Sequence, residues 1–208
     1  LSPLAIVGAE DPPFGVRGYF HAEFSQPMNS RQTWSAGGDA ASDAARQGND
    51  IGAAAVFAAT GHSLRIDVKV GFSHISAEQA KRNIQRETPG WFFDGIRDKA
   101  KAAWTRELSK IEVKGGTEEQ RTVFYSALYR VMGRPSNLVE GDSYFSGADS
   151  KVHPAGGRGF YVGGNLWGSY RSLHPLQLLL DPTRQVDFVR SYMSLYEHWG
   201  WMLGYGRM

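Results

Sequence analysis

The clearest periodic pattern in the chain is an alternation of apolar and charged residues over positions 64–70. Its apolar positions are Leu64, Ile66, Val68 and Val70, and its charged positions are Arg65, Asp67 and Lys69. Successive side chains of a β-strand point to opposite faces, so this period of two predicts a strand. The runs GVRGYFHAEFSQP and DIGAAAVFAAT predict further strands, and the small, polar run SAGGDAASDAARQGND between them predicts a long loop.

After residue 75 the apolar residues recur at steps of three and four, which is the helical period. Ser76 and Gln79 fit a capping box at the start of a short helix, and Thr88-Pro89-Gly90 is expected to end it. This spacing turns Ala80 and Ile84 inward. The first strands and the later helices therefore meet near residue 76, which favours an α+β protein with segregated units over alternating βαβ units.

Two longer helices are predicted next. The apolar positions of the first are Phe93, Ile96, Ala100, Trp104, Leu108 and Ile111. Gly115-Gly116 is expected to end it, and a second capping box formed by Thr117 and Gln120 begins the next helix. The apolar positions of that helix are Phe124, Leu128 and Val131.

A glycine-rich segment from Arg134 to Gly164 carries no clear period and is predicted to be an irregular loop. Loops of that length are usually functional or disordered. Beyond it, Asp181 as N-cap and Pro182 at the first helical position open the last helix. Its apolar positions are Val186, Val189, Met193 and Tyr196.

Composition excludes several classes of protein. Lys and Arg number 23 against 21 Asp and Glu, so charge alone indicates no nucleic-acid partner. No window reaches about 18 continuous apolar residues, so no membrane span is expected. Cysteine is absent, which excludes disulfides, thiolate metal sites and a cysteine nucleophile.

Local spacing does not predict a metal site. The six histidines are scattered, with no pair at helical ligand spacing, which argues against a site built on histidine. The acidic run VEGDSYFSGADS is only superficially like a calcium loop, because its carboxylates and glycine do not align with an EF-hand. Calcium at this run is therefore the minor alternative.

Trp167, Tyr170 and Arg171 form the most informative side-chain cluster of the sequence. Trp and Tyr offer flat apolar faces to sugar C–H groups, and Arg offers several donors to hydroxyl or carboxylate groups. The competing interpretation is a helix start that packs its aromatic rings and leaves one arginine on the surface. Residue types alone favour that packing interpretation.

Longer motifs change this balance. The runs FYSALYRVMGRPSNLVEGDSYFSGAD and NLWGSYRSLHPLQLLLDPTRQVDFVRSYMSLYEHWGWM are similar to glycoside hydrolase family 92, the exo-acting α-mannosidases. That family typically shows Phe-Tyr-x-Ala-Leu-Tyr, an Asp-x-Asp-Gly-x-Tyr loop, and Leu-Trp-Asp-x-Tyr-Arg leading into His-Pro-Leu. VGFSHISAEQAKRNI and FFDGIRDKAKAAWTRELSKIEVKG resemble the family's link between domains, so the resemblance runs from Gly15 to Trp201.

The resemblance implies an α+β multidomain fold. Residues 1–75 correspond to the C-terminal part of a β-sandwich, 76–116 to linker helices, and 117–208 to the truncated N-terminal part of an (α/α)6 catalytic toroid. The sugar pocket is expected between sandwich and toroid, with the Trp167–Arg171 cluster at the leading end of one toroid helix. The buried body of that helix is expected to be Leu173, Leu176 and Leu179.

Substrate-binding residues follow from the same resemblance. They are Trp167, Gly168, Tyr170, Arg171, Asp142 and Tyr144. The chain departs from the family pattern in two places: Gly168 stands where the family has Asp, and the run WGWML, with Trp199 and Leu203, stands where the family tends to have Gly-Gly-x-x-Pro. Either the pocket has been re-specified or activity has been lost.

The catalytic residues are not identified in the chain. The resemblance places both carboxylates and most of a calcium site beyond Met208. The acidic residues left near the expected pocket are Glu140, Asp142, Asp149 and Glu197. Each is expected to order a loop, contact sugar or be solvated.

The function implied is a portion of an exo-acting, calcium-dependent, inverting α-mannosidase that acts on mannose-containing glycans in the periplasm or outside the cell. The 208-residue chain alone is expected to be inactive. The alternative is a catalytically inactive carbohydrate-binding or scaffold derivative of the family. Apolar helix faces without partners are expected to be covered by the remainder of the enzyme or by another copy of the chain.

Overall fold

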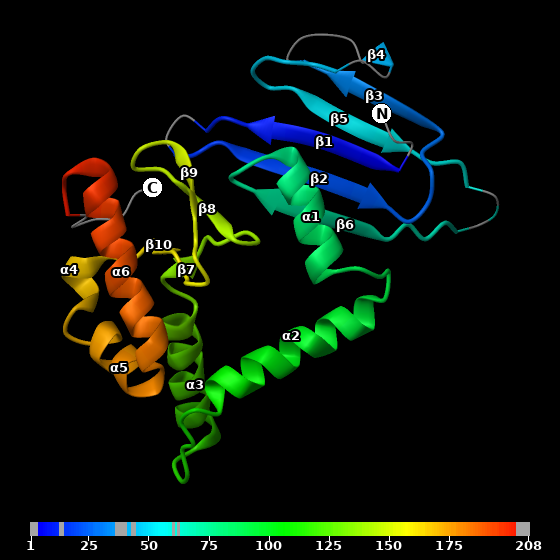
Figure 1. Cartoon of the computed structure of the whole chain (residues 1–208). Helices are drawn as coiled ribbons and strands as arrows, with labels where there is room; N and C mark the ends of the chain where they lie inside the picture. The colour runs from blue at the N-terminus through cyan, green and yellow to red at the C-terminus, as the bar shows by residue number, and fades with distance from the viewer. Residues whose placement is uncertain are drawn as a thin grey trace. The chain divides into compact units, whose positions relative to one another are not determined.

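The computed structural model in Figure 1 describes residues 4–12, 15–35, 41–42, 45–59, 61 and 63–202. This part of the chain is α+β: strands β1–β6 come first, followed by helices α1–α3, the short strands β7–β10 and helices α4–α6. It divides into two compact units. The first comprises Leu1–Ala9, Tyr19–Phe72 and Ala77–Trp91, and the second comprises Glu10–Gly18, Ser73–Ser76 and Phe92–Met208.

The first unit contains two three-stranded sheets. One has the strand order β1-β2-β6, and the other has the order β4-β3-β5 with antiparallel pairing. The bounds are β1 Ala5–Glu10, β2 Gly18–Phe24, β3 Ser30–Trp34, β4 Ala41–Ser42, β5 Gly52–Val56 and β6 Val68–Ser73. The predicted strands are therefore present, but β4 lies inside the predicted long loop because it pairs with β3. Residues 36–40 and 43–44 of that loop lie outside the described residues.

Helix α1 (Ala77–Glu87) covers one face of β6. Ala80 and Ile84 are buried, as the helical spacing predicted. A Cβ on Gly71 would overlap the carbonyl oxygen of Ala80, so only glycine lets the helix approach the strand this closely. The amide of Asn83 donates to the carbonyl of Phe72 at 2.9 Å and fixes the same contact.

The alternating segment is a strand only in its second half. Residues 64–67 lie outside β6, which begins at Val68. Its apolar residues Val68, Val70 and Phe72 are exposed, at 65% for Val70, whereas Gly71 and Ser73 on the opposite face are buried. The small residues face α1 because only short side chains let the helix pack closely on the strand. The face that carries Val68, Val70 and Phe72 is exposed.

The second unit contains the remaining helices. They are α2 Phe93–Leu108, α3 Glu118–Met132, α4 Leu166–Ser169, α5 Leu173–Leu180 and α6 Pro182–Trp199. Helix α2 packs against α3, where the rings of Trp104 and Tyr129 lie 4.3 Å apart, and α5 packs against α6. The capping box of Thr117 and Gln120 is present in full. Asp181 caps α6 and Pro182 is its first residue, as predicted.

The long helix ends earlier than the sequence predicted. Helix α2 stops at Leu108 rather than at Gly115-Gly116. The Tyr125 hydroxyl of α3 donates to the carbonyl of Ile111 at 3.2 Å and accepts from the N–H of Val113 at 3.3 Å. These bonds fix the backbone after the helix in a non-helical path along α3.

The glycine-rich segment from 134 to 164 is not an irregular loop. It contains two antiparallel pairs, β7 (Ser136–Asn137) with β10 (Tyr161–Val162) and β8 (Ser143–Ser146) with β9 (Lys151–Pro154). The buried residues Tyr144, Ala155 and Phe160 of this segment form a hydrophobic core with Leu195 of α6. The segment is ordered because its aromatic rings reach a helix far along the chain.

The helical period located α6 but not its buried face. Phe188, Ser191 and Leu195 are buried. The apolar positions named from the sequence, Val186, Val189, Met193 and Tyr196, are all exposed. Among the described residues, no helix has the length and apolar character needed to span a membrane.

Candidate functional site

The chain reaches the predicted sugar-binding cluster through Gly163 and Gly164. Gly163 has φ of +81°, a left-handed conformation that favours glycine. A Cβ on Gly164 would overlap the Tyr192 hydroxyl and come within 3.3 Å of the Pro135 ring. The two glycines therefore let the backbone pass between the start of β7 and helix α6.

The cluster itself is a short helix followed by a turn. The Asn165 side chain caps α4 by accepting from the N–H of Gly168 at 3.2 Å. Trp167 is 74% exposed and Tyr170 is exposed as well. The guanidinium of Arg171 lies 5.1 Å from the centre of the Tyr170 ring. Two aromatic rings and a forked donor are thus free to meet a ligand.

The expected toroid helix is divided into two. Helix α4 ends at Ser169, and α5 begins at Leu173. The leucines expected as its buried body behave differently from one another: Leu173 and Leu176 are half-buried, and Leu179 is 81% exposed. The buried side chain of α5 is Gln177, whose amide donates to the carbonyl of Val131 at 3.3 Å.

Gly168 occupies a position where a side chain would disturb the cap. A Cβ there would lie 2.9 Å from the Asn165 amide nitrogen. The glycine therefore leaves room for Asn165 to close the first turn of α4. The signal that could have shown this is the Asn-x-x-Gly spacing, because an N-cap side chain bonds the backbone of the third residue after it.

Asp142 and Tyr144 lie in different surroundings. Tyr144 is 8% exposed, and its ring stacks on Phe160 with centroids 3.8 Å apart. Desolvation raises the pKa of its hydroxyl, against a hydrogen bond from Ser194. The Asp142 carbonyl accepts from the N–H of Ala155 at 2.8 Å, while its side chain is exposed. A sugar contact by either residue stays a prediction.

The remaining acidic residues have separate roles. Glu140 orders a loop, because its carboxylate accepts from the N–H of His74 at 2.9 Å. Glu197 is exposed. Asp149 accepts from the N–H of Lys151 and contacts His153. The sequence departure at Leu203 lies outside the described residues.

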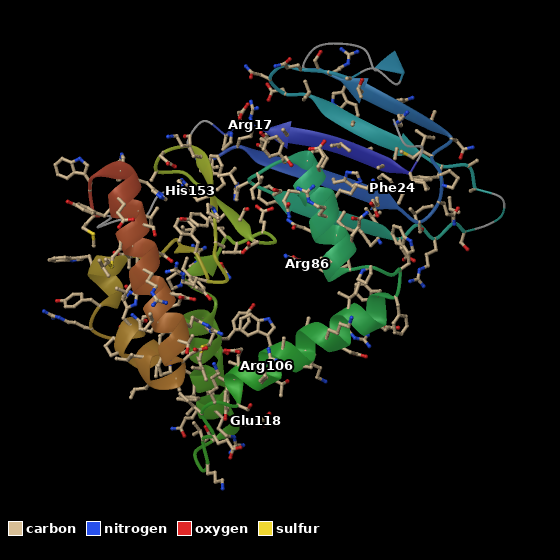
Figure 2. The ribbon with its side chains drawn as sticks, in the orientation of Figure 1. Arg17, Phe24, Arg86, Arg106, Glu118 and His153 are labelled. Atoms are coloured by element: carbon tan, nitrogen blue, oxygen red, sulfur yellow. The ribbon has the colours of Figure 1, made fainter. Side chains whose placement is uncertain are left out.

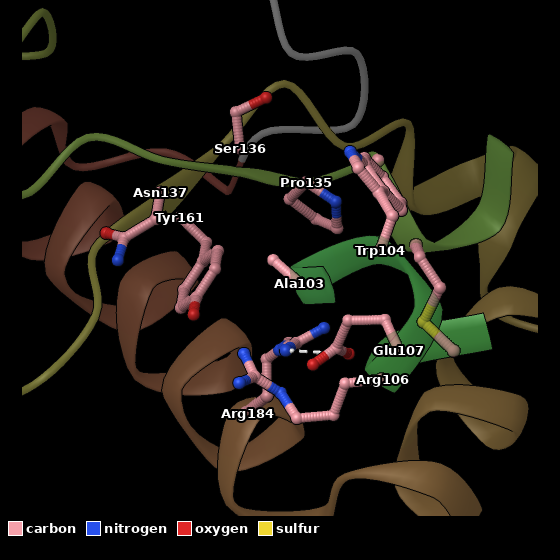
Figure 3. Close-up of a pocket in the computed structure, with 11 residues that line it drawn as sticks. Ala103, Trp104, Arg106, Glu107, Pro135, Ser136, Asn137, Tyr161 and Arg184 are labelled. Carbon is pink, nitrogen blue, oxygen red and sulfur yellow. Dashed lines mark hydrogen bonds and ion pairs between the residues drawn. The ribbon is translucent and has the colours of Figure 1, made fainter. Parts of the chain in front are cut away.

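The structure also shows a pocket that the sequence did not predict. A hollow of about 330 Å³ lies among α2, the end of α3, β7, β10 and the start of α6. Figure 3 shows Trp104 and Tyr161 on opposite sides of it, with Glu107 and Arg184 between the helices below. The Arg184 guanidinium donates to the Glu107 carboxylate at 3.1 Å.

Glu107 and Arg184 belong to a closed ring of four charges. Lys110 lies 3.0 Å from Glu107 and 3.3 Å from Asp181, and Arg184 lies 3.4 Å from Asp181. Desolvation works to raise the pKa of Glu107 and of Asp181. Hydrogen bonds and the neighbouring positive charges outweigh it, so the pKa of both carboxyls lies below its ordinary value.

The fold brings two of the scattered histidines together with a carboxylate, in a cluster whose side chains could hold a metal ion. Asp149, His153 and His198 each offer one ligand atom, and these atoms lie within 4.8 Å of one another. Helical spacing could not find it, since His153 is on β9 and His198 is on α6. The set has two nitrogen donors and one carboxylate, whereas calcium takes six to eight oxygens. It does not fit the calcium that the resemblance implied, and no other such cluster occurs among the residues described.

A family model and a curated relative both match part of the chain. A model described as the glycosyl hydrolase family 92 catalytic domain matches residues 79–205. An uncharacterized secreted glycosidase of Arthroderma benhamiae is 40% identical over 80 residues, which are 36% of this chain and 10% of that protein. The chain therefore spans a small part of this curated relative.

Solved structures give the same result over most of the chain. An inverting mannosidase of family GH92 from Bacteroides thetaiotaomicron is 28% identical with a TM-score of 0.80, and the match covers 96% of this chain and 28% of that one. The GH92 glycosyl hydrolase ccman5 is 26% identical with a TM-score of 0.80, covering 94% of this chain and 28% of that one. The chain thus spans less than a third of either structure.

Proposed function

The chain belongs to glycosyl hydrolase family 92, and from that premise we propose that it is a portion of an exo-acting, calcium-dependent, inverting α-mannosidase that hydrolyses α-mannosidic linkages of glycans. The observation that carries the proposal is the match of 96% of the chain to an inverting mannosidase of that family, at 28% identity. A secreted or periplasmic location is part of the proposal, since a relative is named a secreted glycosidase.

The proposed architecture assigns each part of the chain to a larger domain. Residues 1–75 contribute to a β-sandwich, residues 76–116 link the domains, and residues 117–208 contribute the first helices of an (α/α)6 toroid. Strands up to β6 and helices from α1 onward are consistent with this division. Exposed apolar side chains such as Val70 and Leu179 would face the remainder of the enzyme.

The proposed contribution of the chain to catalysis is to bind and orient the sugar. Trp167 supplies a stacking wall for the C–H face of mannose, and Arg171 beside Tyr170 supplies donors for its hydroxyls. Asp142 and Tyr144 are proposed to form a loop at the edge of the sugar pocket. Gly168 withholds the carboxylate that the family pattern places here, so the ligand must be bound through the rings and the arginine.

The chemical step needs groups beyond these. An inverting glycosidase uses an acid and a base about 6.5–9.5 Å apart, with the attacking water between them. We propose that both carboxylates lie in the remainder of the enzyme, because Glu140 orders a loop and Glu107 and Asp181 pair with cations. When bound, calcium would polarise sugar hydroxyls as a hard cation, through ligands other than the Asp149 cluster.

The second candidate function is a carbohydrate-binding or scaffold protein derived from the family. Gly168 favours it, because Gly lacks both oxygens of the expected Asp. The two candidates differ in turnover and agree in sugar binding.

The deciding experiment is an assay of the product of the complete reading frame that encodes these residues, beside the purified 208-residue chain. An aryl α-mannoside is the substrate, with calcium present or removed by chelation, and the anomer released is followed by NMR. Calcium-dependent release of the inverted anomer supports the enzyme. Mannose binding without turnover supports the binding protein. Turnover by the 208-residue chain alone would contradict the proposal that the catalytic carboxylates lie in the remainder of the enzyme.

A further inference from the structure

A cluster outside the proposed sugar-binding residues joins the β8–β9 hairpin to the last turn of α6. Asp149 is in the turn between the two strands, His153 is on β9 and His198 is near the end of α6. His153 lies in Figure 2 beside the upper part of α6. All three side chains are half-buried.

Each imidazole is positioned by a neighbour. His153 Nε2 lies 3.0 Å from one oxygen of Asp149 and 3.2 Å from the other. His198 Nδ1 lies 3.0 Å from the hydroxyl of Ser146, a fully buried residue, which leaves Nε2 of His198 for another partner. The hairpin thus holds both rings in a defined orientation.

Aromatic stacking holds the same rings from their faces. The centre of the His153 ring lies 5.5 Å from that of Tyr144 and 4.0 Å from that of His198, and both pairs are stacked. Tyr144 in turn stacks on Phe160 at 3.8 Å. These contacts keep the two histidines close together in the folded protein.

We propose that Asp149, His153 and His198 bind one divalent transition-metal ion, with Zn²⁺ the expected occupant. Two imidazoles and one carboxylate are ligands that suit zinc, with a fourth position left for water. Bonds of about 2.0–2.2 Å at tetrahedral angles separate ligand atoms by about 3.3–3.5 Å. The 3.0 Å between His153 and Asp149 is close to that spacing, and all three ligand atoms are within 4.8 Å.

The geometry defines what binding must change. The rings of His153 and His198 are nearly parallel, at 13°, and a shared ion requires one ring to turn so that the two lone pairs converge. Ser146 is the outer partner that orients His198, as hydrogen-bond partners of metal-binding histidines commonly do. A bound ion would tie the hairpin to α6, because its ligands come from both.

Titration of the metal-free 208-residue chain with Zn²⁺ in a calorimeter, and with Co²⁺ by absorption, tests the proposal. Wild-type protein should take up one equivalent, show the ligand-field bands of tetrahedral Co²⁺, and melt at a higher temperature with Zn²⁺. Calcium should not bind at this cluster, because two of the three ligand atoms of the cluster are nitrogens and calcium prefers oxygen ligands. These readouts are independent of mannoside hydrolysis, so the inference stands or falls separately from the proposed function.

Variants separate ligand loss from misfolding. His153→Phe keeps an aromatic ring in the stack, and His198→Asn keeps a nitrogen near Ser146, while each removes a ligand. Loss of an outer hydrogen-bond partner typically lowers metal affinity roughly 10- to 100-fold, and Ser146→Ala should lower Zn²⁺ affinity by an amount in that range. His153→Phe and His198→Asn should each lower it by more, because they remove a ligand. Glu197→Gln, an exposed neighbour, is the matched control and should bind as wild type does.

Two results would overturn the site. One is the absence of zinc uptake by wild-type protein. The other is unchanged affinity in His153→Phe or in His198→Asn, which would show that the ion binds elsewhere. Circular dichroism and the thermal midpoint without metal show that each variant is folded before it is titrated.

Discussion

Two neighbouring segments of the second unit reverse what their compositions suggest. The glycine-rich segment from 134 to 164 lacks a period, yet it contributes Tyr144 and Phe160 to the core. The segment from 165 to 180 is rich in leucine and aromatic residues, yet Trp167 and Leu179 are among its exposed side chains. Burial therefore depends on which other element covers a side chain, and apolar character alone does not ensure it.

The difference arises from partners distant in sequence. Phe160 and Tyr144 pack with Leu195 of α6, and the Phe160 backbone is bonded to Leu138 and Asn137. Leu179 lies on a face of α5 that no described element covers. The comparison teaches that an ordered, aromatic core can be built on turns, while helix faces stay open for another surface.

The largest expected effect is on the packed segment. Phe160→Ala should lower the free energy of unfolding by about 3–5 kcal/mol, because it removes a fully packed ring and leaves a cavity. Urea denaturation of the purified chain measures this. Leu179→Ala is the matched control and should cost far less, since its side chain is already in solvent. Equal losses for the two variants would abolish the contrast between the segments.

The next effect concerns ligand binding by the open segment. Gly168→Asp should strengthen mannose binding by at most about 1.5–3 kcal/mol, through a charge-assisted hydrogen bond to a hydroxyl. Asn165 must shift to admit the new Cβ, because that atom would lie 2.9 Å from the Asn165 amide nitrogen. Calorimetry with mannose and with α-linked mannobiose measures it. Weaker binding would show that Gly168 makes space for a different substrate group.

A smaller effect is expected where α2 meets α6. Glu107→Gln should cost about 1 kcal/mol of stability at neutral pH, because it opens the charge ring formed with Lys110, Arg184 and Asp181. The pKa of both carboxyls is lowered in the folded state. Their contribution is therefore present above the ordinary value of about 4 and is lost as pH falls through the folded-state pKa.

Denaturation midpoints between pH 7 and pH 3 check this sign. Wild-type protein should lose stability at the acid end, and Glu107→Gln should lose less over the same range. The exposed Glu112→Gln is the control. An identical acid dependence in wild type and Glu107→Gln would exclude a role for the ring.

The smallest expected effect is the stability cost of Trp167→Ala. An exposed ring away from any core should change the free energy of unfolding by no more than about 0.5 kcal/mol. The same variant should lose mannose affinity if the ring is a stacking wall. A clear loss of stability with unchanged sugar affinity would show that Trp167 is a packing residue. The free energy of unfolding and the mannose affinity can both be measured on one preparation of the variant.

Helix starts and some buried positions could be predicted from the sequence, because these features depend on residues only a few positions apart. The capping box of Thr117 and Gln120, the Asp181-Pro182 start of α6 and the inward Ala80 and Ile84 are all of this kind. The buried face of α6 was not accessible in this way, because the partners of Phe188, Ser191 and Leu195 are distant in sequence: Phe188 and Ser191 contact Tyr161 of β10, and Leu195 packs with Tyr144 and Phe160. Residue type identified Val186 and Val189 instead, and both side chains are exposed among the residues that the structure describes.

The candidate sites follow the same division. Trp167, Tyr170 and Arg171 could be named because they lie within five positions and match a family motif. The Glu107–Arg184 pair spans 77 positions, and His153 meets His198 from a different element. No period or short motif records such pairs. They become visible only when the fold brings the side chains together.

Asp181 has a consequence for how this position can evolve. Its carboxylate accepts from the N–H of Arg184 to begin α6 and also contacts Lys110 and Arg184 as an ion. Asn would keep the cap and lose the charge, whereas Glu would keep the charge and set it too far from the first turn. Neither Asn nor Glu preserves both roles. We therefore expect substitutions of Asp181 to be tolerated only after Lys110 or Arg184 has changed.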